Sequence, residues 1–148
     1  MKDLELAYLA GLFDGEGCVQ IAHHKPQRNK RTEQHTLRCA VNMTDEVCVK
    51  SFLVFGGSIC QKTRDIINPK WQNQWTWSVS SNQALRFLEI LLPYLRLKQE
   101  QAKLAIEFQR FRSVKYNPFG QRAKIPPEEI EQRNWYWQKL KELKRIHR

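Results

Sequence analysis

The sequence predicts an α+β domain whose elements follow the order α, ββ, α, ββ, αα. An apolar segment with helical periodicity opens the chain, at residues 4–17. Two pairs of segments with alternating apolar and polar residues follow it and predict two β-hairpins. The C-terminal third has helical periodicity again. At 148 residues and without an internal repeat, the chain suits one folded unit with its own core.

The first helix has two unequal faces when it is wound at 100° per residue. The bulky half suits the core of the chain itself and comprises Leu6, Tyr8, Leu9, Leu12 and Phe13. The other half is small or acidic and comprises Ala7, Ala10, Gly11, Asp14 and Gly15. Each glycine costs about 1 kcal/mol of helix propensity. A close contact with a second backbone would offset that cost, so the small half predicts a helix–helix interface.

Two acids lie at the C-terminal end of this helix, where Gly15 and Gly17 are stop signals. A helix C-terminus carries partial negative charge, so Asp14 and Glu16 are poorly placed unless something compensates them. Two interpretations stay open. Either Glu16 is a solvated residue on the turn, which composition alone favours, or the carboxylates hold a cation.

The charge balance indicates a polyanionic partner. There are 25 basic and 15 acidic side chains, which gives a formal net charge of +10. Acids interrupt the apolar N-terminal run, which is untypical of a signal peptide, and no segment reaches the roughly 18 apolar residues of a membrane span. The four cysteines lack C-x-x-C spacing, so they do not predict a structural zinc site. We expect a reducing compartment.

The first hairpin is expected to pair residues 18–24 with residues 36–44. One face buries Val19, Ile21, Leu37, Cys39 and Val41. The other face carries Gln20, Ala22, His24, Arg38 and Asn42, and the connection adds Lys25, Arg28, Lys30 and Arg31. A polar, cationic ribbon of this kind fits the major groove of DNA, whereas the alternative is an ordinary solvated face. The basic connection favours DNA.

A short helix at residues 46–55 precedes the second hairpin, whose strands are expected at residues 58–64 and 71–80. Its exposed face would carry Lys62, Arg64, Gln72, Gln74 and Thr76. Glutamine can read adenine, and arginine or lysine can read guanine. Trp71, Trp75 and Trp77 share a face with Val79 and are therefore expected in the core.

The C-terminal part predicts a helix after Ser80, which Pro93 interrupts, and a second helix at residues 98–111. We divide the chain into a core domain, residues 1–113, and a linker with a basic helix packed on it, residues 114–148. That last helix ends in the basic stretch 139–148. It is either a solvated amphipathic surface or a clamp for phosphates, and the residues do not decide between the two.

Residues 9–17, LAGLFDGEG, resemble the nine-residue signature of the LAGLIDADG homing endonucleases. The resemblance implies an αββαββα fold with an antiparallel, saddle-shaped sheet, to which the last helix is an addition. It implies signature helices that pair across a two-fold axis. It also implies that Glu16, the acid at the eighth position, binds a divalent metal at the scissile phosphates, together with Gly15.

Residues 92–102 resemble the Pro-aromatic-Leu-x-Leu-Lys-x-x-Gln-Ala segment of homodimeric members of the same family. The resemblance implies that Lys98 lies near the active site and helps to activate water or to stabilise phosphate charge. Taken alone, Lys98 would be an ordinary surface lysine. One position departs from the pattern, because Met43 stands where some members have a water-positioning glutamine, and that role stays unassigned.

A single signature motif implies a homodimer, because a second, identical helix is needed to complete the pair. The resemblance then implies an intron-encoded, Mg²⁺-dependent (or Mn²⁺-dependent) endonuclease with Glu16 and Lys98 as its catalytic residues. It would cut both strands of a long, near-palindromic DNA site and leave 3′ overhangs. The alternatives on the same fold are a maturase that binds intron RNA and a DNA-binding protein that does not cleave. We expect the cytoplasm of a prokaryote rather than an organelle.

Overall fold

The computed structural model describes residues 2–25, 33–112 and 125–146. The helices and strands confirm the predicted order of elements. They are α1 (Asp3–Glu16), β1 (Gly17–His24), β2 (Gln34–Met43), α2 (Glu46–Lys50), the 3₁₀ helix η1 (Ser51–Phe55), β3 (Ser58–Lys62), β4 (Gln74–Ser80), α3 (Ser81–Leu91), the 3₁₀ helix η2 (Leu92–Tyr94), α4 (Gln99–Phe111) and α5 (Pro127–Ile146). The fold is α+β, as the sequence predicts.

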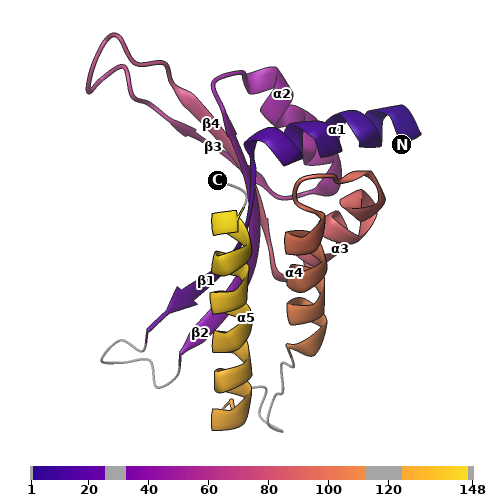
Figure 1. The fold of residues 1–148 in the computed structure, drawn as a ribbon. Coiled ribbons are helices and arrows are strands. Elements are labelled where there is room, and N and C mark those ends of the chain that lie inside the picture. Colours follow the sequence, from indigo (N-terminus) through magenta and orange to yellow (C-terminus); the bar gives the residue numbers. More distant parts are fainter. Residues whose placement is uncertain (1, 26–32, 113–124, 147–148) are drawn as a thin grey trace, which may run out of the picture.

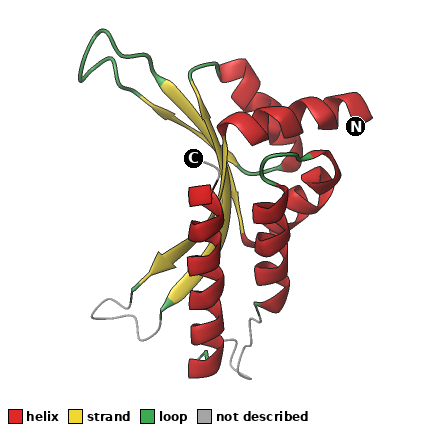
Figure 2. Ribbon diagram, in the orientation of Figure 1, coloured by secondary structure: helices red, strands yellow, loops and turns green. Residues whose placement is uncertain are grey.

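The strands form one antiparallel sheet in the order β1-β2-β4-β3, so the first strands of the two hairpins do not meet and the second strands pair at the centre. Opposite partners include Gln20 with Arg38 in the first hairpin and Asn42 with Thr76 across the centre. The two hairpins diverge from the middle of the sheet, with β3 and β4 running toward the upper left and β1 and β2 toward the lower left (Figure 1). Colouring by secondary structure shows α1 to α4 gathered beside the sheet and α5 running along β1 and β2 (Figure 2).

The core lies between one face of this sheet and the helices. The five residues expected on the buried face of the first hairpin are all buried, namely Val19, Ile21, Leu37, Cys39 and Val41. Trp77 from β4 packs edge-on against Phe87 from α3, with ring centroids 4.9 Å apart. Its indole N–H donates to the carbonyl of Gly56 at 2.8 Å, so the one polar group of this large buried side chain has a partner.

The end of η1 depends on two glycines. Gly56 and Gly57 have φ values of 80° and 86°, in the region that favours glycine. A Cβ on Gly57 would also lie 2.5 Å from the carbonyl oxygen of Ser78 in β4. The turn into β3 therefore requires glycine at residue 57 both for its conformation and for its close approach to β4.

The second hairpin is shorter than the sequence predicts, because β3 ends at Lys62 and β4 begins only at Gln74. The side chain of Asn73 accepts the N–H of Arg64 at 2.8 Å and donates to Asp65 at 3.1 Å, so these bonds replace ladder pairing. Trp71 consequently lies in the connection with 51% of its surface exposed. The expectation of a core position is wrong for Trp71 and right for Trp77, while Trp75 is half-buried.

Helix α5 packs on α4 and β1. Tyr136 lies between Phe108 and Phe111 of α4, and its hydroxyl donates to Glu107 at 2.8 Å. The predicted domain division at residue 113 and the linker after it lie outside the described residues. Every described helix is too short or too polar to cross a bilayer.

Candidate active site and DNA-binding face

The carboxylate of Asp14 joins the end of α1 to the start of α4. It accepts the backbone N–H groups of Arg96 at 2.7 Å, Leu97 at 3.2 Å and Lys98 at 2.9 Å. These three residues directly precede α4, and Asp14 is buried, with 8% of its surface exposed. Three N–H donors stabilise a carboxylate that the helix dipole of α1 alone would disfavour.

Lys98 makes a second hydrogen bond with Asp14, because its ammonium group donates to the backbone carbonyl of Asp14. The side chain is only partly exposed. Burial lowers the pKa of Lys98, and the negative charges of Asp14 and Glu16 act in the opposite direction. The ammonium is therefore held at a fixed place, close to acidic groups and partly shielded from water.

A cleft of 570 Å³ opens beside this junction. Its lining comes from α1, β1, the segment before α4, and α5, and comprises Asp14, Gly15, Gly17, Cys18, Leu97, Lys98, Gln101 and Lys144. Residues from both ends of the chain thus enclose the space next to the last turn of α1. Its two ammonium groups, those of Lys98 and Lys144, can bind an anionic group such as a phosphate.

Glu16 is the last residue of α1 and is exposed. Within the described part of the chain its carboxylate makes no hydrogen bond or ion pair, although its charge acts on Lys98. The free carboxylate and the last carbonyl groups of α1, including that of Gly15, offer only oxygen donors. Such donors, with the partial negative charge of a helix C-terminus, fit a hard divalent cation such as Mg²⁺.

Lys144 is a cleft residue that the sequence analysis did not single out. It comes from the last turns of α5, and its ammonium lies 3.3 Å from the thiol of Cys18. Its positive charge contributes to lowering the pKa of Lys98. The basic end of the chain was the one available signal, but its position depends on how α5 docks, which helical periodicity does not show.

The buried and exposed faces of α1 are rotated about the helix axis relative to the faces that the sequence predicts. Ala10 has no exposed surface, and Asp14 is buried against the segment before α4, so neither belongs to the face open to a partner. This corrects the expected interface positions of Ala10 and Asp14. Conversely, Tyr8 was expected in the core but is 57% exposed. Ala10 and Asp14 face inward because Asp14 must reach the N–H groups before α4, and Ala10 lies one turn earlier on the same side.

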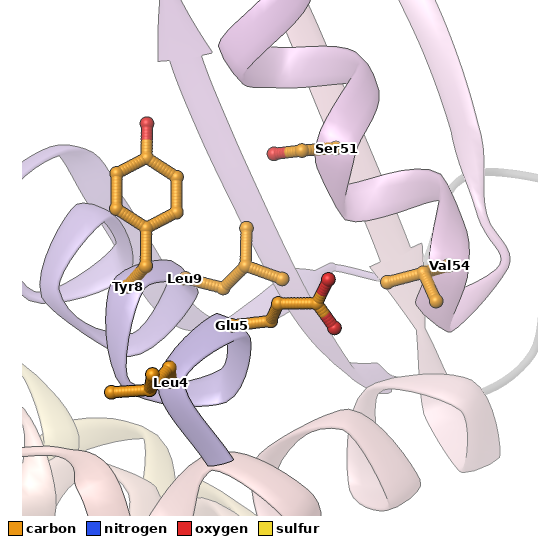
Figure 3. A pocket seen from close by; sticks show the side chains of 6 residues that line it. All are labelled: Leu4, Glu5, Tyr8, Leu9, Ser51 and Val54. Carbon is orange, nitrogen blue, oxygen red and sulfur yellow. The ribbon is translucent and has the colours of Figure 1, made fainter. Parts of the chain in front are cut away.

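The open side of α1 carries small and apolar residues, namely Leu4, Ala7, Tyr8, Gly11 and Gly15. A Cβ added to Gly11 or Gly15 would meet nothing within 4 Å. Beside this side lies a groove of 390 Å³ between α1 and η1, lined by Leu4, Glu5, Tyr8, Leu9, Ser51 and Val54. Figure 3 shows Glu5 of α1 and Val54 of η1 pointing toward one another across this groove.

The candidate DNA-reading residues share one face of the sheet. Register places Gln20 opposite Arg38, Ala22 opposite Thr36 and Lys62 opposite Gln74. Asn42 accepts a hydrogen bond from the hydroxyl of Thr76 on the neighbouring strand. Because side chains alternate along a strand, these residues face away from the buried set and are exposed or half-buried. They form a continuous polar surface over both hairpins.

The other predicted contacts lie at the ends of the hairpins. His24 and Lys25 are exposed at the end of β1. Arg64 and Gln72 are exposed in the β3–β4 connection and not in strands, which corrects their expected place on a strand face. Arg28, Lys30 and Arg31 lie outside the described residues.

A profile of the LAGLIDADG endonuclease family matches residues 9–115, a range that contains Glu16 and Lys98. No curated protein matches the chain. Among solved structures, the homing endonuclease I-CvuI, in complex with DNA in the presence of Mg, has a TM-score of 0.74 and 22% identity over 95% of this chain and 82% of its own. The archaeal intron-encoded I-Vdi141I, also with DNA, has a TM-score of 0.59 and 16% identity over 75% of this chain and 70% of its own. These likenesses agree with the fold, and the match over most of the sequence establishes that this chain belongs to the LAGLIDADG endonuclease family.

Proposed function

We propose that this site-specific DNA endonuclease acts as a homodimer and depends on a divalent metal, Mg²⁺ or Mn²⁺. It would cut both strands of a long, near-palindromic site and leave 3′ overhangs. The observation that carries the proposal is the free carboxylate of Glu16, whose neighbours Gly15 and Gly17 line the cleft that also holds Lys98 and Lys144. Supporting it, the related I-CvuI was crystallised with DNA in the presence of Mg and of Ca.

Glu16 and the carbonyl of Gly15 would hold the metal, which when bound would supply Lewis-acid stabilisation of charge on the scissile phosphate. Asp14 acts indirectly, because its carboxylate fixes the backbone of residues 96–98, which ends in Lys98, through three hydrogen bonds. Lys98 and Lys144 place two positive charges beside the same space. These charges would bind the phosphodiester and stabilise the negative charge that grows on it during cleavage.

The dimer supplies the second active site. Each protomer offers one Glu16, so two-fold pairing would assign one carboxylate to each DNA strand. The exposed side of α1 suits that contact, because Gly11 and Gly15 leave room for a second backbone. Leu4 and Tyr8, which are 83% and 57% exposed, would be covered by the partner. Pairing there would align the polar faces of four hairpins along the DNA.

Phosphate neutralisation by the basic residues would make binding fall steeply with salt. The polar face would read bases, with Arg38, Gln74 and Asn42 among its central residues. Two half-sites related by the protein two-fold axis would give the target its near-palindromic sequence.

The test is cleavage of a randomised duplex library with Mg²⁺, comparing the wild type with Glu16→Gln. Specific double-strand cuts with 3′ overhangs are expected, with loss of cutting and retention of DNA binding in Glu16→Gln. Glu46→Gln is the matched control, because Glu46 pairs with Lys50 on α2, outside the cleft. No cutting at any site, together with tight binding to a structured intron RNA, would contradict the proposal in favour of a maturase.

A further inference from the structure

A second cluster of metal-binding side chains lies at the other end of β1, away from Glu16. His23 is opposite His35 in the β1–β2 ladder. Glu33 precedes His35 by two residues, so its side chain falls on the same face. Seven residues of extended chain separate His23 from Glu16, which corresponds to roughly 20 Å. The cluster is therefore distinct from the cleft at the end of α1.

The three side chains lie close together, and an ion shared by all of them would draw them closer still. One ring nitrogen from each histidine and one carboxylate oxygen from Glu33 all lie within 4.8 Å of one another. The Nε2 atom of His23 and the Oε2 atom of Glu33 are 3.3 Å apart. Ligands about 2.0–2.1 Å from a tetrahedral zinc ion are roughly 3.3 Å from each other, so this pair already has the required spacing.

Asn134 from α5 fixes the protonation of His35. Its amide nitrogen donates to the Glu33 carboxylate at 3.2 Å, since a carboxylate only accepts. Its oxygen must then face His35, whose Nε2 lies 2.8 Å away and so carries the proton. The Nδ1 atom is thereby left as a bare lone pair.

That lone pair has no partner in the described part of the chain, although His35 has no exposed surface. Burial also lowers the pKa of His35, which keeps the ring neutral. A buried polar atom without a partner costs free energy, and binding of a metal is one way to satisfy it. A ligating histidine commonly donates its other N–H to an oxygen, which is what Nε2 does toward Asn134.

We propose that His23, Glu33 and His35 bind a divalent transition metal, with zinc as the best match, and that the metal fastens the β1–β2 hairpin beneath α5. Two imidazoles and one carboxylate leave a fourth tetrahedral position for water. Nitrogen donors discriminate against Mg²⁺, which prefers oxygen, so the two metal sites of the chain would take different ions.

Packing from α5 closes the site on one side. The ring of Trp137 lies 4.5 Å from that of His23, and the rings of His23 and His35 stack at 4.8 Å. The side chain of His23 is 11% exposed and that of Glu33 is 31% exposed, so an ion can enter from the Glu33 side. Metal binding would cross-link β1 to the start of β2, next to Asn134 and Trp137 of α5.

The experiment uses the whole chain without DNA, stripped with EDTA and kept in excess Mg²⁺. Titration with Co²⁺ should give visible d–d absorption that saturates at one equivalent per chain, and Zn²⁺ should displace it. Zn²⁺ at about a thousand times its Kd should raise Tm by roughly 10 °C. His23→Gln and Glu33→Gln should abolish both signals while circular dichroism shows the fold retained.

Two matched variants keep the test specific. His24→Gln removes an adjacent exposed histidine, and Cys60→Ser removes an exposed thiol. Both variants should bind Co²⁺ as the wild type does. Asn134→Ala should weaken binding by about 10–100-fold, as removal of a partner of a ligating histidine does. Absence of the Co²⁺ signal in the wild type, or its persistence in both His23→Gln and Glu33→Gln, would overturn the proposal and leave a purely hydrogen-bonded cluster.

Discussion

Two hydrogen bonds join Asp14 and Lys98, and Lys98 is the donor in both. The carboxylate of Asp14 accepts the backbone N–H of Lys98 at 2.9 Å, and the ammonium of Lys98 donates to the backbone carbonyl of Asp14. The residues are 84 positions apart in the sequence. These two hydrogen bonds fix α1 against the start of α4. They also hold the ammonium group of Lys98 near the carboxylate of Glu16, which is proposed to bind the metal.

Asp14→Asn should destabilise the protein and abolish cleavage although Glu16 remains. Asparagine offers one acceptor oxygen in place of two and no charge, so at least one buried N–H loses its partner. Loss of charge-assisted hydrogen bonds should cost about 2–3 kcal/mol of unfolding free energy, measured in urea. Asp45→Asn is the control, because asparagine caps α2 as well as aspartate does. An unchanged stability for Asp14→Asn would show that the three short contacts carry no free energy.

Lys144→Met should reduce kcat by about 10–100-fold and change DNA affinity less, because the charge acts at the reacting phosphate. Lys141→Met removes an equal charge one turn earlier, where the ammonium lies over the ring of Trp137 and not in the cleft. Single-turnover cleavage of a bound duplex separates the two effects. Equal losses of kcat in the two variants would mean that Lys144 contributes only to the overall positive potential of α5.

Gly11→Leu should convert the proposed homodimer to a monomer without loss of folding. A Cβ at Gly11 meets nothing within the protomer, so the larger side chain obstructs only a partner. Removal of glycine from a helix also stabilises the protomer by about 1 kcal/mol. Sedimentation velocity gives the oligomeric state, and Lys103→Leu adds a leucine to the exposed surface of α4 as the control. A dimer that survives Gly11→Leu would place the interface elsewhere.

Arg38→Ala should weaken recognition at one base position by about 1–3 kcal/mol and relax specificity there. Arg38 is exposed on the polar face and pairs with Gln20 on one side and Ser80 on the other. Binding to a panel of single-base variants of the target measures the effect. Lys25→Ala, at the end of β1, should instead weaken binding to all variants alike and reduce its salt dependence.

Alkaline pH should loosen α5 through Tyr136. Burial, together with the hydroxyl's hydrogen bond to Glu107, raises the pKa of Tyr136 to about 12 from 10.0. Between these two values the unfolded chain releases the proton first, so the folded state binds more protons and stability falls as pH rises. The loss should reach up to about 1 kcal/mol at pH 11. Urea unfolding at pH 8 and 11 measures it, and Tyr136→Phe should remove this part of the pH dependence.

Alternation along the strands was sufficient to predict both faces of the first hairpin, because a two-residue period admits only one division into buried and exposed sets. It failed at Trp71, where the side chain of Asn73 caps the connection and ends the ladder early. Such a bond between a side chain and a distant backbone group leaves no periodic trace in the sequence.

The rotation of α1 was harder to predict, since small residues lie on both of its sides. Ala10 faces the core because Asp14, one turn later, must reach the N–H groups of residues 96–98. Lys144 was missed for a related reason, because α5 reaches the cleft only through tertiary docking. The signature segment points to the candidate site, whereas the other groups that line it come from 80 to 130 residues further along the chain.

The pairing of β2 with β4 at the centre of the sheet has a consequence for synthesis on the ribosome. The first hairpin can form as soon as residue 43 has emerged, but its apolar face has no cover until α3 and α4 have been made. During that interval the unpaired edge of β2 and the apolar face of the first hairpin are both exposed to other nascent chains. Fragments that stop before α4 should therefore aggregate, and efficient production of this enzyme should depend on chaperones that shield the hairpin until the second half of the chain arrives.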